Sequence, residues 1–289
     1  MQTITEENIT NAVLASMRPT SARTHLLLAG LVKHLHAFVR EVEPTEAEWL
    51  AAVQFLTRTG QMCSDKRQEF ILLSDVLGVS MLVDAINHRT TDGTTETTVT
   101  GPFYVPPRDL PLGSLIATGP EAERGEPTVV RGTVTNPAGQ PVPGATIAVW
   151  QSDDLGYYDT QDPGQPDENL RALLRPDAAG YFWFRTIKPA PYPIPDDGPV
   201  GHLLRTAGRH PMRPAHIHFM LTAPGYEPVV THLFVAGDEF LESDAVFGVK
   251  ESLVLPFVLN HSLADAQRYG TSAPFYDVSY DFKLRPVPA

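Results

Sequence analysis

Two histidines separated by one residue, His216 and His218, form the sharpest chemical signal in the sequence. They open an apolar run that is typical of a β-strand, and residues i and i+2 of a strand point to the same side. Two imidazoles on one side of a strand can bind one metal ion. The same spacing also fits two hydrogen-bonded histidines on a polar strand face, so the pattern alone leaves both interpretations open.

Three further side chains strengthen the case for a metal site. Arg213 lies three residues before the histidine pair and places a permanent positive charge beside it. Tyr192 belongs to the proline-rich run 189–195, which presents it on a stiff loop because proline fixes φ. Tyr158 follows an expected strand that ends at Trp150. Taken singly, the tyrosines also fit aromatic rings packed beneath loops, and Arg213 also fits a structural cation paired with a carboxylate.

Other catalytic patterns are missing from the sequence. It contains no His-Glu-x-x-His zinc motif, no Gly-x-Ser-x-Gly nucleophile motif and no Gly-Lys-Ser/Thr phosphate loop. A cupin-type histidine pair usually has a glutamate about four residues later, but Thr222 stands there and the first carboxylate after the pair is Glu227. The adjacent Asp153 and Asp154 are expected to be a solvated pair rather than a general acid.

The elements that position these residues divide by proline content. Residues 1–100 contain two prolines and residues 101–289 contain 25. Because proline breaks helix interiors, the first part can be helical and the second largely cannot. Apolar residues at three-to-four spacing predict helices around 27–38, 49–56 and 70–85, and Thr45 with Glu48 forms a capping-box pattern.

The second part reads as strands with long loops. Strands are expected at 129–135, 145–150, 181–187, 216–223 and 229–235. The first two flank residues 136–141, which fit a hairpin or a sandwich connection. The predicted fold class is therefore α+β, with a helical N-terminal domain over residues 1–100 and a C-terminal β-sandwich domain over residues 101–289.

Composition excludes several classes of protein. The 289 residues include 22 Lys and Arg against 34 Asp and Glu, a formal charge of −12, which argues against nucleic acid and anionic membranes as partners. No apolar run approaches the roughly 18–20 residues that span a bilayer. The N-terminal residues lack a secretory signal pattern. The single Cys63 excludes an internal disulfide and a Cys-rich metal site, so a reducing cytoplasm is the expected location.

Three blocks taken together resemble the intradiol ring-cleaving dioxygenases. They are residues 156–158, 189–192 and 208–219, and they follow the family's order along the chain. The resemblance extends over nearly the whole sequence. It implies a helical domain that builds a homodimer and a β-sandwich that holds a non-haem ferric ion, Fe³⁺.

The resemblance also implies the ligands of that ion, namely Tyr158, Tyr192, His216 and His218. The family pattern makes Tyr192 and His218 axial, with Tyr158, His216 and a hydroxide equatorial. Two tyrosinates and one hydroxide cancel the charge of Fe³⁺, and a neutral site is easier to bury. Hard phenolate oxygens also favour ferric iron over zinc.

The implied reaction is oxygen-dependent opening of an aromatic ring between two adjacent hydroxyls. The diol gives one proton to the hydroxide and one to Tyr192, which leaves the metal. O₂ then attacks the activated ring, which opens to a diacid. In this scheme Arg213 stabilises the negative charge that develops on the substrate.

Three features resemble the branch of the family that acts on hydroxyquinol (benzene-1,2,4-triol), whose product is 3-hydroxy-cis,cis-muconate or its tautomer maleylacetate. They are segments 79–88 and 94–105 and His232, where catechol-cleaving relatives typically carry glutamine. A third ring hydroxyl needs a polar partner, and Asp75 could supply it; the alternative for Asp75 is a solvated helix position. The branch pattern places His232 near the metal and makes the pocket wall from Leu72, Asp75, Val99, Thr100, Gly101, Pro102 and Val246. The sequence departs from that pattern at Thr100 and Tyr104.

Two rival functions remain at this point. The same fold could cleave catechol or a substituted catechol to cis,cis-muconates. Alternatively, residues 132–145 fit the strand–turn–strand of metal-free, transthyretin-like binding modules, which would need no set of two tyrosines and two histidines.

The expected partners follow from the architecture. The apolar stripes of the helical part exceed what its helices can bury among themselves, so a homodimer through residues 1–100 is expected. The family resemblance adds a phospholipid that can occupy an apolar tunnel at the dimer interface. The small-molecule partners are an aromatic diol or triol and O₂.

Overall fold

The computed structural model describes residues 3–64, 67–90 and 92–287. The chain forms two compact units, and the sequence divides between them after Arg58. This division differs from the boundary expected at residue 100. The physical reason is that two helices before residue 100 bond to the sheet-rich unit, as in the hydrogen bond from Arg209 to the carbonyl of Val76.

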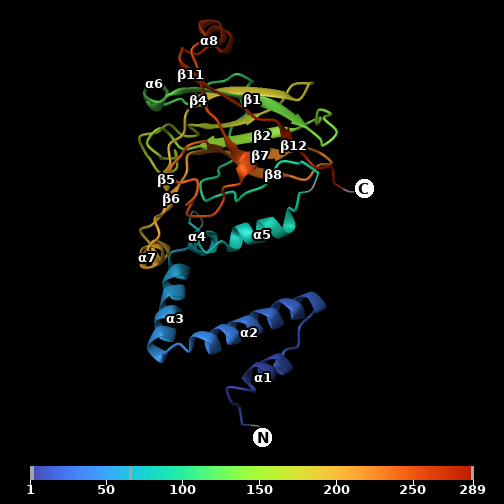
Figure 1. Ribbon diagram of the computed structural model, residues 1–289, viewed down its shortest axis with the longest axis vertical. Coiled ribbons are helices and arrows are strands. Elements are labelled where there is room, and N and C mark those ends of the chain that lie inside the picture. Colours follow the sequence, from blue (N-terminus) through green and yellow to red (C-terminus); the bar gives the residue numbers. More distant parts are fainter. Residues whose placement is uncertain (1–2, 65–66, 91, 288–289) are drawn as a thin grey trace. The chain divides into compact units, whose positions relative to one another are not determined.

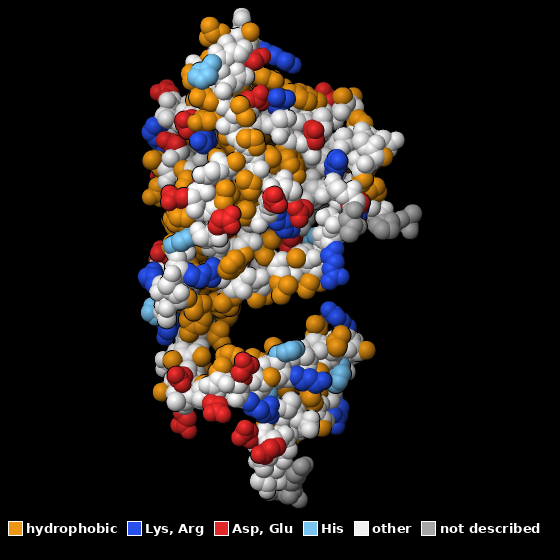
Figure 2. Space-filling model, in the orientation of Figure 1, with side chains coloured by type: hydrophobic (Ala, Val, Ile, Leu, Met, Phe, Trp, Pro, Cys, Tyr) orange, Lys and Arg blue, Asp and Glu red, His pale blue; other side chains and the backbone are white. Residues whose placement is uncertain are grey.

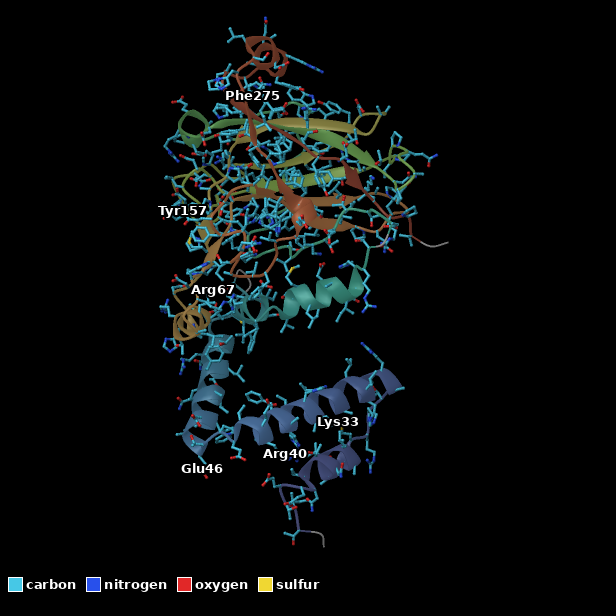
Figure 3. All side chains as sticks on the ribbon, viewed as in Figure 1. Lys33, Arg40, Glu46, Arg67, Tyr157 and Phe275 are labelled. Atoms are coloured by element: carbon cyan, nitrogen blue, oxygen red, sulfur yellow. The ribbon has the colours of Figure 1, made fainter. Side chains whose placement is uncertain are left out.

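The first unit is helical. It contains α1 (Ile9–Ser16), α2 (Ala22–Val42) and most of α3 (Glu46–Gln61). The predicted capping box is confirmed, because the backbone N–H of Thr45 donates to Glu48 Oε2 at 2.8 Å and the N–H of Glu48 donates to Thr45 Oγ1 at 3.3 Å. Arg40, on α2, donates to Thr10 Oγ1 on α1 at 2.8 Å and so holds the two helices together (Figure 3).

The apolar stripe of α2 is not buried within its own unit. Hydrophobic side chains lie open on the surface of this unit (Figure 2). The stripe residues are between 42% and 58% exposed, and they are Leu27, Leu28, Leu31, Leu35 and Phe38. A hydrophobic face of this size needs a cover in water.

Two short helices stand where the periodicity predicts one over 70–85. These are α4 (Glu69–Val76) and α5 (Val79–Asn87). Gly78 separates them with a φ of +71°, in the left-handed region that ends helices and that glycine adopts without strain. α5 ends at Asn87, before a segment that is rich in β-branched threonine.

The second unit is built on a β-sandwich, whose stacked sheets are seen in Figure 1. One sheet has the order β10–β11–β1–β12 with β4 also paired to β1. Its strands are β1 (Pro127–Thr135), β4 (Tyr181–Ile187), β10 (Val258–Asn260), β11 (Phe275–Ser279) and β12 (Phe282–Lys283). The other sheet has the order β3–β2–β7–β8–β9. Its strands are β2 (Thr146–Gln151), β3 (Arg171–Leu174), β7 (His216–Thr222), β8 (Val229–Val235) and β9 (Val254–Leu255).

The hydrophobic core lies between these sheets. Phe184 from β4 and Phe219 from β7 meet there with ring centroids 6.3 Å apart. Because β1 and β2 belong to different sheets, residues 136–141 connect the two layers of the sandwich, and an antiparallel bridge between Thr135 and Pro141 closes the turn. The predicted α+β fold class is thus confirmed.

Shorter elements complete the second unit. They are the two-stranded ribbon of β5 (Tyr192–Pro193) and β6 (Met212–Arg213), helices α6 (Glu121–Arg124), α7 (Pro199–Thr206) and α8 (Leu263–Tyr269), and the 3₁₀ turn η1 (Glu251–Leu253). Among the helices described, none is long and apolar enough to cross a membrane.

Candidate metal centre

The histidine pair lies on the side of β7 that faces away from the sandwich core. Ile217 and Phe219 point into the core, so the intervening His216 and His218 point to the opposite face, as the strand period requires. Both imidazoles are nevertheless fully buried, because loops cover that face.

The two tyrosines reach the same place from different segments, Tyr158 from a loop and Tyr192 from β5. Tyr158 Oη lies 3.2 Å from Tyr192 Oη, and Tyr192 Oη lies 3.3 Å from His216 Nε2. His216 Nε2 in turn lies 3.1 Å from His218 Nε2. The structure therefore brings together all four side chains that the sequence analysis named as metal ligands.

The donor atoms fit a shared metal ion. Nδ1 of His216 lies 2.6 Å from the carbonyl oxygen of Pro214, an acceptor that places the ring hydrogen on Nδ1 and turns the Nε2 lone pair toward the cluster. Two phenol oxygens and two imidazole nitrogens then face one another at hydrogen-bond distance. Such a buried set suits a bound cation, and a metal site is the chemical interpretation of this cluster.

Burial keeps the imidazoles neutral. It lowers the pKa of His216 to about 3, with Arg213 adding to the effect, and it lowers the pKa of His218 well below the usual range. The neutral form is the one that binds metals. Burial also raises the pKa of Tyr158 and Tyr192, so that without a metal both phenols are protonated at neutral pH.

Arg213 faces the cluster from β6. Its Nε and Nη2 donate to the two carboxylate oxygens of Asp244 at 3.0 and 3.3 Å, while Nη1 lies 3.3 Å from His216 Nε2. Burial opposes the charge of Arg213, but Asp244 and the neighbouring tyrosines outweigh it and raise the pKa of the guanidinium. Arg213 thus fits both interpretations of the sequence. It is paired with a carboxylate, and its Nη1 also faces the cluster.

A third imidazole borders the cluster. His232 lies opposite His218 on β8, with ring centroids 4.2 Å apart. Its Nδ1 lies 2.8 Å from Thr98 Oγ1, and its buried Nε2 has no partner among the described residues. Potential ligand atoms of His216, His218 and His232 lie within 4.8 Å of one another.

Segment 98–103 runs along the cluster. Gly101 has a φ of +73°, and a Cβ there would lie 3.3 Å from the ring of His218, so the backbone passes directly against that imidazole. Phe103 stacks on Tyr158 with centroids 4.6 Å apart. Val99 and Thr100, which precede these two contacts, are half-buried, and Pro102, which lies between them, is exposed.

The remaining expected pocket residues are buried in the same unit. Leu72 and Asp75 come from α4, and Val246 comes from the turn that follows Asp244. Asp75 is 4% exposed, and burial raises its pKa while the charge of Arg213 acts in the opposite direction. The structure therefore excludes the solvated-helix alternative for Asp75.

The expectation that Asp153 and Asp154 form a solvated pair is wrong. Asp153 is buried, and its Oδ1 accepts from the backbone N–H groups of Leu155 and Tyr157 at 2.9 and 2.8 Å. Asp154 is mostly buried and forms a two-bond ion pair with Arg124 at 2.8 Å. The carboxylate of Asp153 shapes the turn that carries Tyr158, a local role that side-chain type alone does not reveal.

Sequence reasoning also missed several neighbours of the cluster. Asp244 is the carboxylate partner of the buried Arg213. The only sequence signal for it is the general rule that a buried arginine needs an acidic partner. Trp150 stacks on His218 with centroids 4.6 Å apart and planes 10° apart, but it was noted only as a strand end. Phe103 and Thr98 lie in segment 94–105, whose resemblance to the hydroxyquinol branch indicates no role for either side chain.

Comparison with known families agrees with this geometry. The family model described as "Dioxygenase" matches residues 99–286, and the one described as "Catechol dioxygenase N terminus" matches residues 21–95. A 6-chlorohydroxyquinol 1,2-dioxygenase of Cupriavidus pinatubonensis is 50% identical over 289 residues, covering 99% of this chain and 100% of the relative. The chain belongs to the intradiol dioxygenase family. The resemblance seen in the sequence is thereby confirmed, and with it the assignment as an oxidoreductase.

Two more comparisons place this intradiol dioxygenase within its family. The structure of a hydroxyquinol 1,2-dioxygenase from Pseudomonas putida DLL-E4 has a TM-score of 0.90 and 46% identity, covering 98% of this chain and 99% of the other. The structure of catechol 1,2-dioxygenase from Acinetobacter radioresistens has a TM-score of 0.85 but 27% identity, covering 99% and 94%. The fold is thus shared across the family, while sequence identity is higher to the relatives named for hydroxyquinol.

Proposed function

We propose that this intradiol dioxygenase opens the ring of hydroxyquinol between its adjacent hydroxyls, using O₂ and a ferric ion. The observation that carries the proposal is the convergence of Tyr158, Tyr192, His216 and His218 in one buried cluster. Two further findings support it, namely the buried Asp75 beside the cluster and the identity of about one half to relatives named for hydroxyquinols. A metal-free binding module has no use for such a donor set.

Ferric iron suits these donors better than the alternatives. Two phenolates and two neutral imidazoles supply hard oxygen ligands and two negative charges, which leaves one charge of Fe³⁺ for a hydroxide. A ferric ion held by the four side chains would supply Lewis acidity, which makes the phenol oxygens acidic and activates the bound diol toward O₂.

The protein's own residues would then orient and neutralise the diol. Tyr192 accepts one diol proton at Oη, the phenol oxygen that lies nearest His216. Arg213 is held by Asp244 on one edge, so its Nη1 presents a fixed positive charge toward the reacting oxygens. The covering loops and the ring of Phe103 exclude water from the reaction.

Asp75 is proposed as the residue that recognises the third hydroxyl. It is 4% exposed, and burial raises its pKa, although a hydrogen bond with Ser80 and the charge of Arg213 act in the opposite direction. A buried carboxyl group of this kind needs hydrogen-bond partners, and a ring hydroxyl supplies one. The other proposed wall residues, Leu72 and Val246, give the rest of the ring an apolar surface.

A visible absorption titration tests the ferric centre. The iron-loaded protein is expected to be wine-red, because tyrosinate bound to Fe³⁺ absorbs visible light. Under anaerobic conditions hydroxyquinol should shift the band to longer wavelength, and admission of air should bleach it as product forms. A protein that stays colourless after ferric reconstitution would overturn the proposal.

Substitution of Asp75 tests the choice of substrate. Asp75→Leu is expected to lower kcat/KM for hydroxyquinol by about 5–150-fold, the effect of roughly 1–3 kcal/mol for one missing buried hydrogen bond. The kcat/KM for catechol should stay within about twofold. Steady-state kinetics with both diols measure the ratio. Parallel losses on the two substrates would show that Asp75 is structural, and a wild-type preference for catechol would favour the catechol alternative.

We also propose that the protein forms a homodimer through its N-terminal helices, that a phospholipid lies at that interface and that the protein is cytoplasmic. These proposals rest on the sequence and on the family resemblance. The exposed apolar stripe of α2 supports the first.

A further inference from the structure

Arg209 joins two segments of the proposed pocket wall that are far apart in the sequence. Its Nη1 donates to the backbone carbonyl of Val76 at the end of α4, and its Nη2 donates to the carbonyl of Ala245 at 2.9 Å. The same guanidinium lies over the ring of Phe247, 4.7 Å from its centroid. One side chain therefore bridges α4 to the turn over residues 244–248.

Both bridged segments carry proposed pocket residues. Val76 is the neighbour of Asp75, and Ala245 is the neighbour of Val246. Val76 is the last residue of α4, where carbonyl groups lack helical partners and a cation is favoured by the helix dipole. The position of Arg209 thus fixes the end of α4 relative to the turn that presents Val246.

The turn itself is held rigidly from the other side. Asp244 binds Arg213 with two hydrogen bonds and accepts from the N–H groups of Val246 and Gly248 at 3.3 and 2.9 Å. Two arginines from one short segment therefore hold the same turn. Arg213 anchors it to the cluster, and Arg209 anchors it to α4.

The backbone of Arg209 is equally fixed. Its N–H donates to the carbonyl of Leu204 at 2.8 Å, directly after Gly208, which has a φ of +67° and follows α7. This left-handed turn is a common way for a helix to end and sets the direction in which the next side chain leaves. The guanidinium can bond two carbonyls at once because its N–H groups form a planar fork, which lysine lacks.

We infer that Arg209 is a positioning residue for substrate discrimination, because it sets the separation of the Asp75 and Val246 walls around the substituted part of the ring. The inference rests on the proposed function, since it takes these two residues as pocket walls. The bonds described for Arg209 go to backbone carbonyls outside the Tyr and His cluster. Its loss should therefore alter which diol binds well and leave the metal centre intact.

The test compares Arg209→Lys and Arg209→Gln with the wild type. The probes are catechol, 4-methylcatechol and hydroxyquinol, and the readouts are kcat, KM and the anaerobic dissociation constant from the colour shift. We expect the dissociation constant and KM for hydroxyquinol to rise about tenfold relative to catechol in both variants. The kcat for catechol and the visible band of the resting protein should be unchanged.

Arg205→Gln is the matched control. Arg205 lies four residues earlier and is exposed, and its described side-chain bonds go to Asp196 on the same surface, so its loss should alter none of these values. A uniform loss on all three diols, a changed resting band, or unchanged discrimination in both Arg209 variants would overturn the inference.

Failure of the proposed function gives a different result. In that case the wild type itself prefers catechol to hydroxyquinol. The inference about Arg209 is then decided by the ratio of 4-methylcatechol to catechol, which must move in the Arg209 variants and stay fixed in Arg205→Gln.

Discussion

Tyr157 and Tyr158 are neighbours in the sequence and opposites in environment. Tyr157 is 51% exposed and lies at the surface of the unit (Figure 3), whereas Tyr158 is fully buried in the cluster. The carboxylate of Asp153 accepts from the N–H groups of Leu155 and Tyr157 and so holds the backbone turn from which both rings extend. The position of the Tyr158 phenol therefore depends on the conformation of this backbone turn as well as on the contacts of its ring.

Gly156 is the position where this geometry is most demanding. Its φ is +89°, and a Cβ there would lie 2.9 Å from the carbonyl oxygen of Pro191 and 3.0 Å from Cβ of Tyr192. The loop that carries Tyr158 can therefore approach the start of β5, which carries Tyr192, only because residue 156 has no side chain.

We predict that Gly156→Ala weakens the metal site. The added methyl group must push the two tyrosine-bearing segments apart, so iron content and the intensity of the visible band should fall at least severalfold. Gly139→Ala is the control, because Gly139 has a similar φ of +78° but nothing within 4 Å of the added atom. Equal iron loading of the two variants, measured by metal analysis, would contradict the prediction.

At the scale of elements, the helix expected over 70–85 shows what a sequence pattern cannot resolve. Its apolar spacing continues across Gly78, so periodicity alone predicts one helix. The left-handed backbone at Gly78 instead turns the chain, and a Cβ there would touch the ring of Phe247 at 3.5 Å. That contact comes from a distant part of the sequence, and no local pattern contains it.

Candidate metal ligands on a long strand were easier to predict from the sequence than ligands on loops or very short strands. The period of a strand predicts that His216 and His218 share a face, and the pairing of β7 with β8 adds His232. Tyr158 lies on a loop and Tyr192 on the two-residue strand β5, which is too short to show a period, so only the family resemblance predicted their convergence. The ion pair of Arg213 and Asp244 spans 31 residues, and the requirement for a partner did not indicate which carboxylate would supply it.

The anchor of α5 leads to a prediction about pH. Asp84 accepts from Thr97 Oγ1 at 2.6 Å and from Lys250 Nζ at 3.1 Å, and its Oδ1 lies 2.8 Å from Nδ1 of the half-exposed His88. Burial opposes its charge, but the bonds with Thr97 and Lys250 outweigh burial and hold the pKa of Asp84 below its usual value. The ionised carboxylate thus stabilises the fold above pH ~4, and that contribution is lost as the pH falls through the folded-state pKa.

We predict that Asp84→Asn lowers the free energy of unfolding by about 1.5–3 kcal/mol at pH 7, the usual value for hydrogen bonds to a charged group. The difference from wild type should shrink when urea unfolding is repeated near pH 3. Asp109→Asn removes an exposed ion pair with Arg175 and should cost less than about 1 kcal/mol at either pH. A difference for Asp84→Asn that is the same at both pH values would contradict the assignment.

At the scale of the whole molecule, the apolar stripe of α2 leads to a prediction about assembly. Leu27, Leu31 and Leu35 are all more than half exposed, and the family relation makes a second copy of the chain the expected cover. Light scattering should give a mass near twice 31.7 kDa. A Leu31→Glu, Leu35→Glu double variant should shift the protein toward monomer. A wild type that already runs as a monomer would refute the prediction.

The stack of Trp150 on His218 has an optical consequence. The indole ring lies flat against an imidazole of the donor cluster, whereas Trp183, on β4 of the other sheet, packs on Tyr269 of α8. A metal that absorbs visible light on the far edge of that imidazole would take up the excitation energy of the indole next to it. The fluorescence of Trp150 should therefore be quenched when the metal binds. A titration that follows tryptophan fluorescence would then measure metal occupancy without an added dye.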